Sequence, residues 1–181
     1  DLGLEQQEYA EIALSKSKDL RNLIADFYDI SVWEAKESAP ELKRIQLDNI
    51  LADSVLAYTE QFKKNGITPS ITFLNSPTFI IADEIMLKRV VNNLISNAVS
   101  YGKDKLNITI SEGDNVSVIF RNNVADERFV NTDRLFDKFY TADLSRNHSG
   151  TGLGLYIVKL LMEKMGGTVK AMSEDNTLYI A

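Results

Sequence analysis

A glycine-rich run in the last third of the chain is the clearest sign of chemistry in this sequence. Residues 149–155 read Ser-Gly-Thr-Gly-Leu-Gly-Leu and lead directly into an apolar helical pattern. Alternate glycines let the backbone approach an anion closely, and a helix starting there offers unpaired N–H groups and the positive end of its dipole. The run indicates a phosphate site, although plain helix starts also use such glycines. The candidate binding residues are Gly150, Thr151, Gly152, Leu153, Gly154 and Leu155.

Two asparagines four residues apart form a second candidate group. Asn93 and Asn97 belong to a predicted helix over 83–101, where they lie at one margin of its apolar stripe, on the side of Arg89. An amide oxygen is a hard, neutral ligand, suited to a Mg²⁺ ion that takes other ligands from water and nucleotide phosphates. Such amides can also bond a neighbouring backbone. Tyr101, one turn further along, could present its ring to a base.

Alternating strands and helices from residue 39 onward must position these groups. The predicted strands are 44–47, 70–74, 78–81, 107–111, 116–121, 168–172 and 178–180, and the predicted helices are 48–64, 83–101 and one that follows the glycine run. Asp48 and Asp83 are the expected N-caps. The segment 122–149 is longer than an ordinary connection, which suggests a lid. These elements predict an α+β fold in which helices cover one face of a mixed sheet.

The first 38 residues follow a different pattern. Neither Gly nor Pro interrupts 4–37, and steps of three and four residues produce a heptad seam. The seam consists of Ala13, Lys16, Leu20, Leu23, Phe27, Ile30 and Glu34. Ile12, Ile24 and Tyr28 widen it, which favours one helix of a bundle over a terminal helix packed on its own domain. Pro40 ends this element, so we expect a first unit at 1–38 and a second at 39–181.

Composition narrows the functional classes. The 181 residues contain no cysteine and one histidine, which argues against disulfides and zinc sites. A net charge of −6 argues against nucleic acid as a partner. The absence of cysteine fits a reducing, cytoplasmic setting. No apolar run approaches the ~20 residues of a membrane span, so we expect a chain without membrane contact.

Three segments, in order, resemble the boxes of the ATP-binding catalytic domain of sensor histidine kinases. Residues 93–101 resemble the asparagine box, 135–140 the phenylalanine box and 150–155 the second glycine box. The resemblance implies the Bergerat ATPase sandwich, shared with gyrase, heat-shock chaperone and mismatch-repair ATPases. It also implies ATP and Mg²⁺ as cofactors. The phenylalanine box favours the kinase branch of this group.

The resemblance also implies roles for single residues. Asn97 would bind Mg²⁺, Asn93 would lie in the metal and phosphate neighbourhood, and Tyr101 would pack against adenine. The glycine run would cradle the phosphates. Arg146, within the lid, would reach the terminal phosphates and share the catalytic role with Asn97, with a solvated lid charge as the alternative.

Phe136 and Phe139 would anchor the lid, or simply pack in the core. One box departs from the family pattern: Asn122 stands where an aspartate usually accepts a hydrogen bond from the adenine amino group, and two following glycines are missing. An asparagine carbonyl can still accept that bond, though without charge. A non-catalytic interaction module that has lost ATP is therefore an alternative.

By position, residues 1–38 resemble the second helix of the family's dimerisation hairpin. The first helix, which carries the phosphoacceptor histidine, is expected to lie outside this chain, because His148 falls within the lid itself. The implied partners are a second copy of the protein and a response regulator, and the parent would be membrane-anchored. A hydrolysing Bergerat ATPase is a further alternative, although Glu84 is the only glutamate in the asparagine helix.

Overall fold

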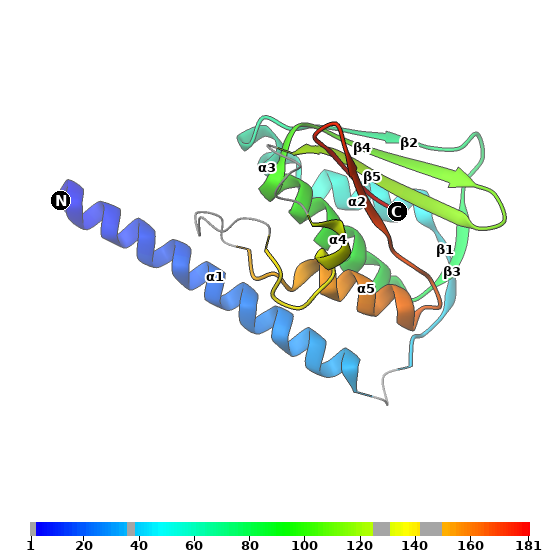
Figure 1. Ribbon diagram of the computed structural model, residues 1–181, viewed down its shortest axis with the longest axis horizontal. Coiled ribbons are helices and arrows are strands. Elements are labelled where there is room, and N and C mark those ends of the chain that lie inside the picture. The colour runs from blue at the N-terminus through cyan, green and yellow to red at the C-terminus, as the bar shows by residue number, and fades with distance from the viewer. Residues whose placement is uncertain (1–2, 36–38, 125–130, 142–149) are drawn as a thin grey trace.

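A long helix lies against an α+β domain in the computed structural model, which describes residues 3–35, 39–124, 131–141 and 150–181 (Figure 1). The described helices are α1 (Leu4–Glu34), α2 (Leu47–Ala57), α3 (Thr59–Lys64), α4 (Glu84–Tyr101), α5 (Gly154–Lys164) and a 3₁₀ turn at Thr132–Arg134. The strands are β1 (Lys43–Gln46), β2 (Thr68–Thr72), β3 (Phe79–Ala82), β4 (Gly102–Glu112), β5 (Val116–Val124), β6 (Ala171–Glu174) and β7 (Thr177–Ile180).

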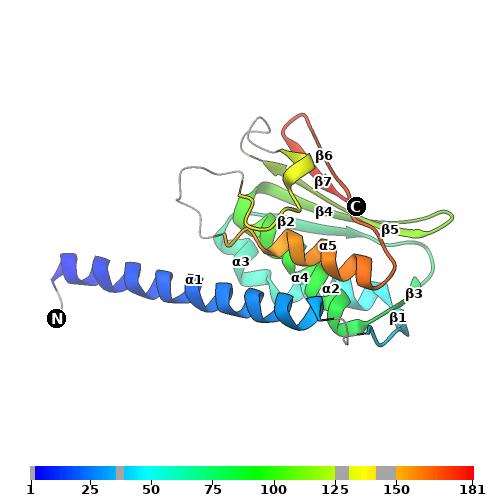
Figure 2. The same ribbon diagram turned by 60° about the horizontal axis from the view of Figure 1, so that its bottom comes forward.

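Five of these strands form the main sheet, in the order β2-β4-β5-β7-β6. β2 runs parallel to β4, and the other neighbours are antiparallel. Figure 2 shows α2, α4 and α5 on one side of this sheet. The predicted fold class, a mixed sheet with helices on one face, is confirmed. The predicted strands at 44–47 and 78–81 correspond to β1 and β3, but these pair with each other in a separate two-stranded sheet, which the sequence did not indicate.

The core fills the space between this sheet and its helices. Alternate residues of β4, Leu106, Ile108 and Ile110, are buried, as expected for a strand with one covered face. Ile157 and Leu161 of α5 meet them as part of one continuous apolar cluster. Burial of these side chains therefore holds α4 and α5 in place on the sheet.

The predicted helix over 48–64 is wrong in two details. It is divided at Tyr58, which leaves the helical conformation with φ −100° and ψ 10°. Gln46, not Asp48, occupies the N-cap position of α2. The Asp48 carboxylate instead accepts a hydrogen bond of 2.8 Å from the Thr78 N–H, because the chain returns past the start of α2 just before β3.

The strand β5 is longer than its apolar pattern indicated. It continues to Val124, so Asn122 lies within the sheet rather than at the start of an irregular segment. Asn122 is paired with Leu106 of β4 and Leu178 of β7. Backbone hydrogen bonds to both neighbours extend the strand past the point where apolar alternation stops.

The helix α1 packs on the domain through only part of its surface. Leu23, Ile30 and Trp33 pack against the core of the domain. Other large apolar side chains of α1 are exposed, and the first half of the helix projects beyond the domain (Figure 1). They include Ile12, Leu20, Ile24, Phe27 and Tyr28. The predicted heptad seam is thus divided, because Leu23 and Ile30 are packed on the domain whereas Leu20 and Phe27 are exposed. Among the described residues, no helix has the length and hydropathy needed to cross a membrane.

Asp83 is the N-cap of α4, as its sequence position predicted. Its Oδ1 accepts hydrogen bonds from the N–H groups of Ile85 and Met86, and its Oδ2 accepts one from Glu41. Burial by itself raises the pKa of Asp83, but these three backbone donors hold that pKa below its ordinary value. The carboxylate form is therefore the one that stabilises the start of α4.

We expect Asp83→Ala to lower the free energy of unfolding by about 1–2 kcal/mol at neutral pH, the usual cost of losing an N-cap. Because the pKa of Asp83 is lowered on folding, the wild-type advantage should shrink as pH falls below the ordinary aspartate value of about 3.9. Urea unfolding at several pH values measures this difference. Asp83→Asn, which keeps one acceptor oxygen, should lose less than Asp83→Ala. An equal loss at every pH would contradict the role of the charge.

Candidate nucleotide site

The glycine run lies against the polar margin of α4. A methyl group added at Gly150 would fall 1.9 Å from the Tyr101 hydroxyl oxygen, and one added at Gly154 would fall 3.8 Å from Asn93 Oδ1. α5 itself begins at Gly154, so the first glycines form the loop that leads into it. The fold thus brings together two predicted groups that are separated by about fifty residues in the sequence.

Gly152 sits where only glycine fits without strain. Its φ is +68°, and an added methyl group would lie 2.6 Å from the carbonyl carbon of Phe139. The Gly152 carbonyl accepts a 2.9 Å hydrogen bond from the Phe139 N–H. This contact fastens the glycine loop to the 135–140 segment.

The two phenylalanines of that segment differ in their surroundings. Phe136 is partly buried against the core. Phe139 is 59% exposed and has a left-handed φ of 62°, so core packing is wrong for this residue. Its backbone, rather than its ring, makes the contact with the glycine loop.

Of the two candidate amides of α4, Asn93 lies beside Gly154 of the glycine loop. Asn93 and Asn97 are both partly buried, one helical turn apart. The Asn93 Nδ2 atom is buried and has no hydrogen-bond partner among the described residues. Such a donor is costly in a folded protein unless a ligand or water satisfies it.

Asn122 lies at the carboxyl end of α4. It is 5% exposed, and its Nδ2 donates to the Asn123 carbonyl over 3.3 Å. The same Nδ2 lies 3.3 Å from the position of a methyl group added at Gly102, the residue that follows Tyr101. Asn122 and Tyr101 therefore approach the same end of the helix from two different elements.

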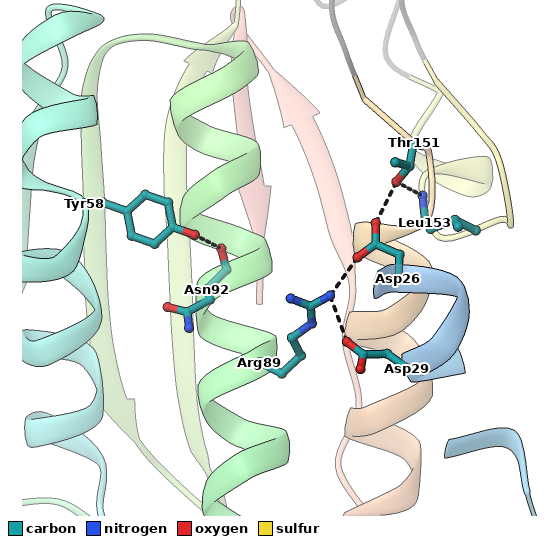
Figure 3. A network of polar contacts seen from close by, with 7 residues as sticks. All are labelled: Asp26, Asp29, Tyr58, Arg89, Asn92, Thr151 and Leu153. Atoms are coloured by element: carbon teal, nitrogen blue, oxygen red, sulfur yellow. Dashed lines mark hydrogen bonds and ion pairs between the residues drawn. The ribbon is translucent and has the colours of Figure 1, made fainter. Parts of the chain in front are cut away.

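A charged network that the sequence did not indicate joins α1 to this site (Figure 3). Arg89 Nη2 of α4 lies 2.7 Å from Asp26 Oδ1 and 2.9 Å from Asp29 Oδ2. The second oxygen of Asp26 accepts a 2.9 Å hydrogen bond from the Thr151 hydroxyl. Burial raises the pKa of Asp29 more than Arg89 lowers it, and Asp26 raises it further. The three-residue spacing of the two acids, beside the buried face of α1, is the only sequence signal for this network.

A second polar contact lies one to two turns further along α1. Glu34 Oε1 accepts hydrogen bonds from Lys138 Nζ at 2.7 Å and from the Tyr156 hydroxyl at 2.5 Å. These two bonds lower the pKa of Glu34. α1 is thereby joined to both the 135–140 segment and α5.

The structure brings some of the candidate binding residues together and leaves others apart. Asn93, Tyr101, Gly150 and Gly154 meet along α4, whereas the Thr151 side chain turns toward α1. Leu153 and Leu155 are buried and partly buried, respectively, so their backbone is what they can offer a ligand. The proposed lid residues Arg146 and His148 lie outside the described residues.

Comparison with known proteins gives consistent matches. Residues 82–180 match the model of the histidine kinase-, DNA gyrase B- and HSP90-like ATPase family. The chain is 29% identical to the sensor histidine kinase YcbM of Bacillus subtilis, over 88% of this chain and 53% of the relative. It is 30% identical to the sensor protein VanS of Enterococcus faecium, over 97% of this chain and 47% of the relative. The chain therefore spans about half the length of these curated relatives.

Solved structures with the same fold cover almost the entire chain. The histidine kinase AdeS of Acinetobacter baumannii has a TM-score of 0.78 at 18% identity, covering 99% of this chain and 83% of its own. Full-length ShkA, solved in complex with AMPPNP, has a TM-score of 0.77 at 26% identity, covering 99% of this chain and 39% of its own. Both matches include α1 as well as the sheet domain.

We expect Gly152→Ala to destabilise the protein more than Gly66→Ala. Both positions have a left-handed φ, +68° and +65°, but a methyl group at Gly66 meets nothing within 4 Å. Gly66→Ala should therefore lower the free energy of unfolding by about 1 kcal/mol, the cost of a left-handed φ for alanine. Gly152→Ala should lower it by roughly 1–2 kcal/mol more, because its methyl group also clashes with the Phe139 backbone. Urea unfolding of the two variants gives the comparison. Equal losses would show that the glycine loop does not pack tightly on the 135–140 segment.

Proposed function

The chain belongs to the histidine kinase-, DNA gyrase B- and HSP90-like ATPase family, and we propose that it is the ATP-binding catalytic part of a two-component sensor histidine kinase. The parent protein transfers the γ-phosphoryl group of ATP to a histidine on another helix, and from there to an aspartate of a response regulator. The curated relatives named as sensor kinases support this branch of the family. They favour it over a module that has lost ATP.

The observation that carries the nucleotide assignment is the unsatisfied amide of Asn93 beside the glycine loop. A buried N–H donor next to closely approaching backbone suits an anionic ligand. ShkA, which shares the fold at 26% identity, is in complex with an ATP analogue. We assign the phosphates to the loop from Gly150 to Leu155 and to Asn93.

We assign Mg²⁺ to the amide oxygen of Asn97, one turn from Asn93. Within the described ranges, no group of three or more His, Asp or Glu side chains is placed to hold a metal ion unaided. A Mg²⁺ ion with one amide ligand, water and phosphate oxygens fits that donor set. When bound, the ion neutralises charge on the phosphates.

The adenine end of the site is assigned to the far end of α4. Tyr101 packs against the base, and the side-chain carbonyl oxygen of Asn122 accepts a hydrogen bond from the adenine amino group. The proximity of both residues to Gly102 supports this pairing. Arg146 is assigned to the terminal phosphates from the segment before the glycine run.

Phosphoryl transfer needs little covalent chemistry from the protein. Positioning and electrostatic stabilisation of the transferred group provide most of the rate enhancement. In this chain the loop amides would orient the phosphates, and Asn97 would orient the end of the triphosphate that binds Mg²⁺. Arg146 would compensate the negative charge that develops on the transferred phosphoryl group. The base for the acceptor histidine comes from another helix.

We propose that residues 1–38 form the second helix of a dimerisation hairpin and that 39–181 form the catalytic domain. The exposed apolar face of α1, including Leu20, Ile24 and Phe27, supports a bundle with further helices. In the parent, those helices come from the same hairpin and from a second copy of the protein. We place this part of the parent in the cytoplasm.

We expect the chain to bind a fluorescent ATP analogue more tightly with Mg²⁺ than with EDTA. Asn97→Ala should remove most of the Mg²⁺ dependence and weaken binding about 10-fold or more, because an unreplaced ligand destabilises the bound ion. Asn92→Ala is the matched control, since the Asn92 side chain lies on the Tyr58 side of α4 (Figure 3). Equal, metal-independent binding by Asn97→Ala and the wild type would reject the magnesium assignment.

Autophosphorylation should fail in this chain alone. We expect no stable label on the purified chain after incubation with γ-labelled ATP. Its only histidine, His148, belongs to the proposed lid just before the glycine run and not to a helix that carries the phosphoacceptor. Label should appear on a separately supplied hairpin that carries the acceptor histidine. Retention of label by the isolated chain would contradict the proposed division of roles.

A further inference from the structure

We propose that Asp26 of α1 and the nucleotide phosphates compete for the glycine loop, so that docking of α1 and binding of ATP oppose each other. This inference rests on the proposed nucleotide site. It adds a role for α1 that concerns neither dimerisation nor phosphotransfer. The contacts between α1 and the loop carry it.

The Thr151 hydroxyl is the meeting point of α1 and the loop (Figure 3). Its oxygen accepts a 3.2 Å hydrogen bond from the Leu153 N–H, and its proton goes to Asp26 Oδ2 at 2.9 Å. Leu153 is the N-cap residue of α5, where backbone N–H groups are free to bind an anion. In this arrangement the Leu153 N–H group donates to the same Thr151 hydroxyl that donates to Asp26.

The net charge of the network also opposes the binding of phosphate while α1 is docked. Asp26 and Asp29 share the single guanidinium of Arg89, so the cluster carries a net charge of −1 when both acids are ionised. The side chains are only 13%, 26% and 30% exposed for Asp26, Asp29 and Arg89, which limits screening by solvent. A polyphosphate that enters the loop beside Thr151 therefore meets an uncompensated carboxylate.

The opposite role, in which Asp26 positions Thr151 to assist ATP, is less consistent with these contacts. If Asp26 positioned Thr151 to assist ATP, the N–H groups of the loop should remain available to the phosphates. In this arrangement the Leu153 N–H is already bonded to the Thr151 hydroxyl. It would also not place an extra negative charge next to an anion site. Competition accounts for both the hydrogen bonds and the charge.

Thermodynamic linkage extends the prediction to distant contacts. If ATP favours release of α1, then any substitution that loosens α1 must increase ATP affinity. Glu34 offers such a site, because it holds α1 to Lys138 and Tyr156 without contacting the glycine loop. Trp33, the only tryptophan of the sequence, packs against the domain core and reports whether α1 is docked.

The test measures the affinity of a fluorescent ATP analogue, in excess Mg²⁺, for three variants of the whole chain. Asp26→Ala should bind about 10-fold more tightly than wild type, and Glu34→Ala about 3-fold more tightly, within the usual range of coupling between sites. Asp19→Ala is the matched control, since Asp19 lies on the same helix and forms its ion pair with Lys16, one turn away on α1. It should leave the affinity unchanged.

Trp33 fluorescence provides the second readout. ATP should shift the wild-type emission toward that of nucleotide-free Asp26→Ala, as the indole loses its packing. Weaker binding by Asp26→Ala would assign Asp26 a positioning role and overturn the inference. If only Asp26→Ala binds more tightly, while the affinity of Glu34→Ala and the Trp33 emission are unchanged, the effect of Asp26 is a local charge effect. That result would also overturn the proposed competition between α1 and ATP.

The two proposals fail differently in this experiment. If the wild type binds no nucleotide, the proposed function fails and the inference fails with it. If the wild type binds Mg-ATP and the two α1 variants match it, only the competition fails. Circular dichroism of each variant confirms that the helical content is retained.

Discussion

The close approach of the glycine loop to α4 is the constraint on which the arrangement of this site depends. Backbone at Gly150 and Gly152 occupies space that a side chain would need, against Tyr101 on one side and the Phe139 backbone on the other. That approach is possible because α4 and α5 pack beside each other on one sheet face through a shared apolar core. Helix packing sets the distance, and glycine permits it.

Polar groups at this junction follow from the same packing. α1 crosses α5 with its buried face toward the domain, which brings Asp26 and Asp29 to Arg89 and places Glu34 against Lys138. Asp26 and Asp29 are largely removed from water and need a partner, which Arg89 supplies. The α1 helix and the glycine loop are consequently parts of one hydrogen-bonded network, joined at Thr151.

Family membership and geometry support the functional proposal from different directions. The matched family extends over 82–180 and so contains α4, the sheet hairpin and the glycine loop. The buried, unpartnered Nδ2 of Asn93 is a property of this particular structure, and Asn93 lies beside Gly154 of the glycine loop, which its Oδ1 approaches. Asn122, held inside β5 rather than in a loop, keeps a polar side chain beside Gly102 at the carboxyl end of α4.

The sequence by itself determined the fold class, the N-cap at Asp83, the hairpin of β4 and β5 and the glycine start of α5, because each depends on local periodicity or backbone preference. It also identified the candidate groups of α4 and the loop. Only the tertiary structure decided the partner of Asp48, the extension of β5 through Asn122 and the network from Asp26 to Thr151. The Asp48 and Thr151 contacts join residues 30 and 125 positions apart, and no local pattern specifies which distant group a charge will meet.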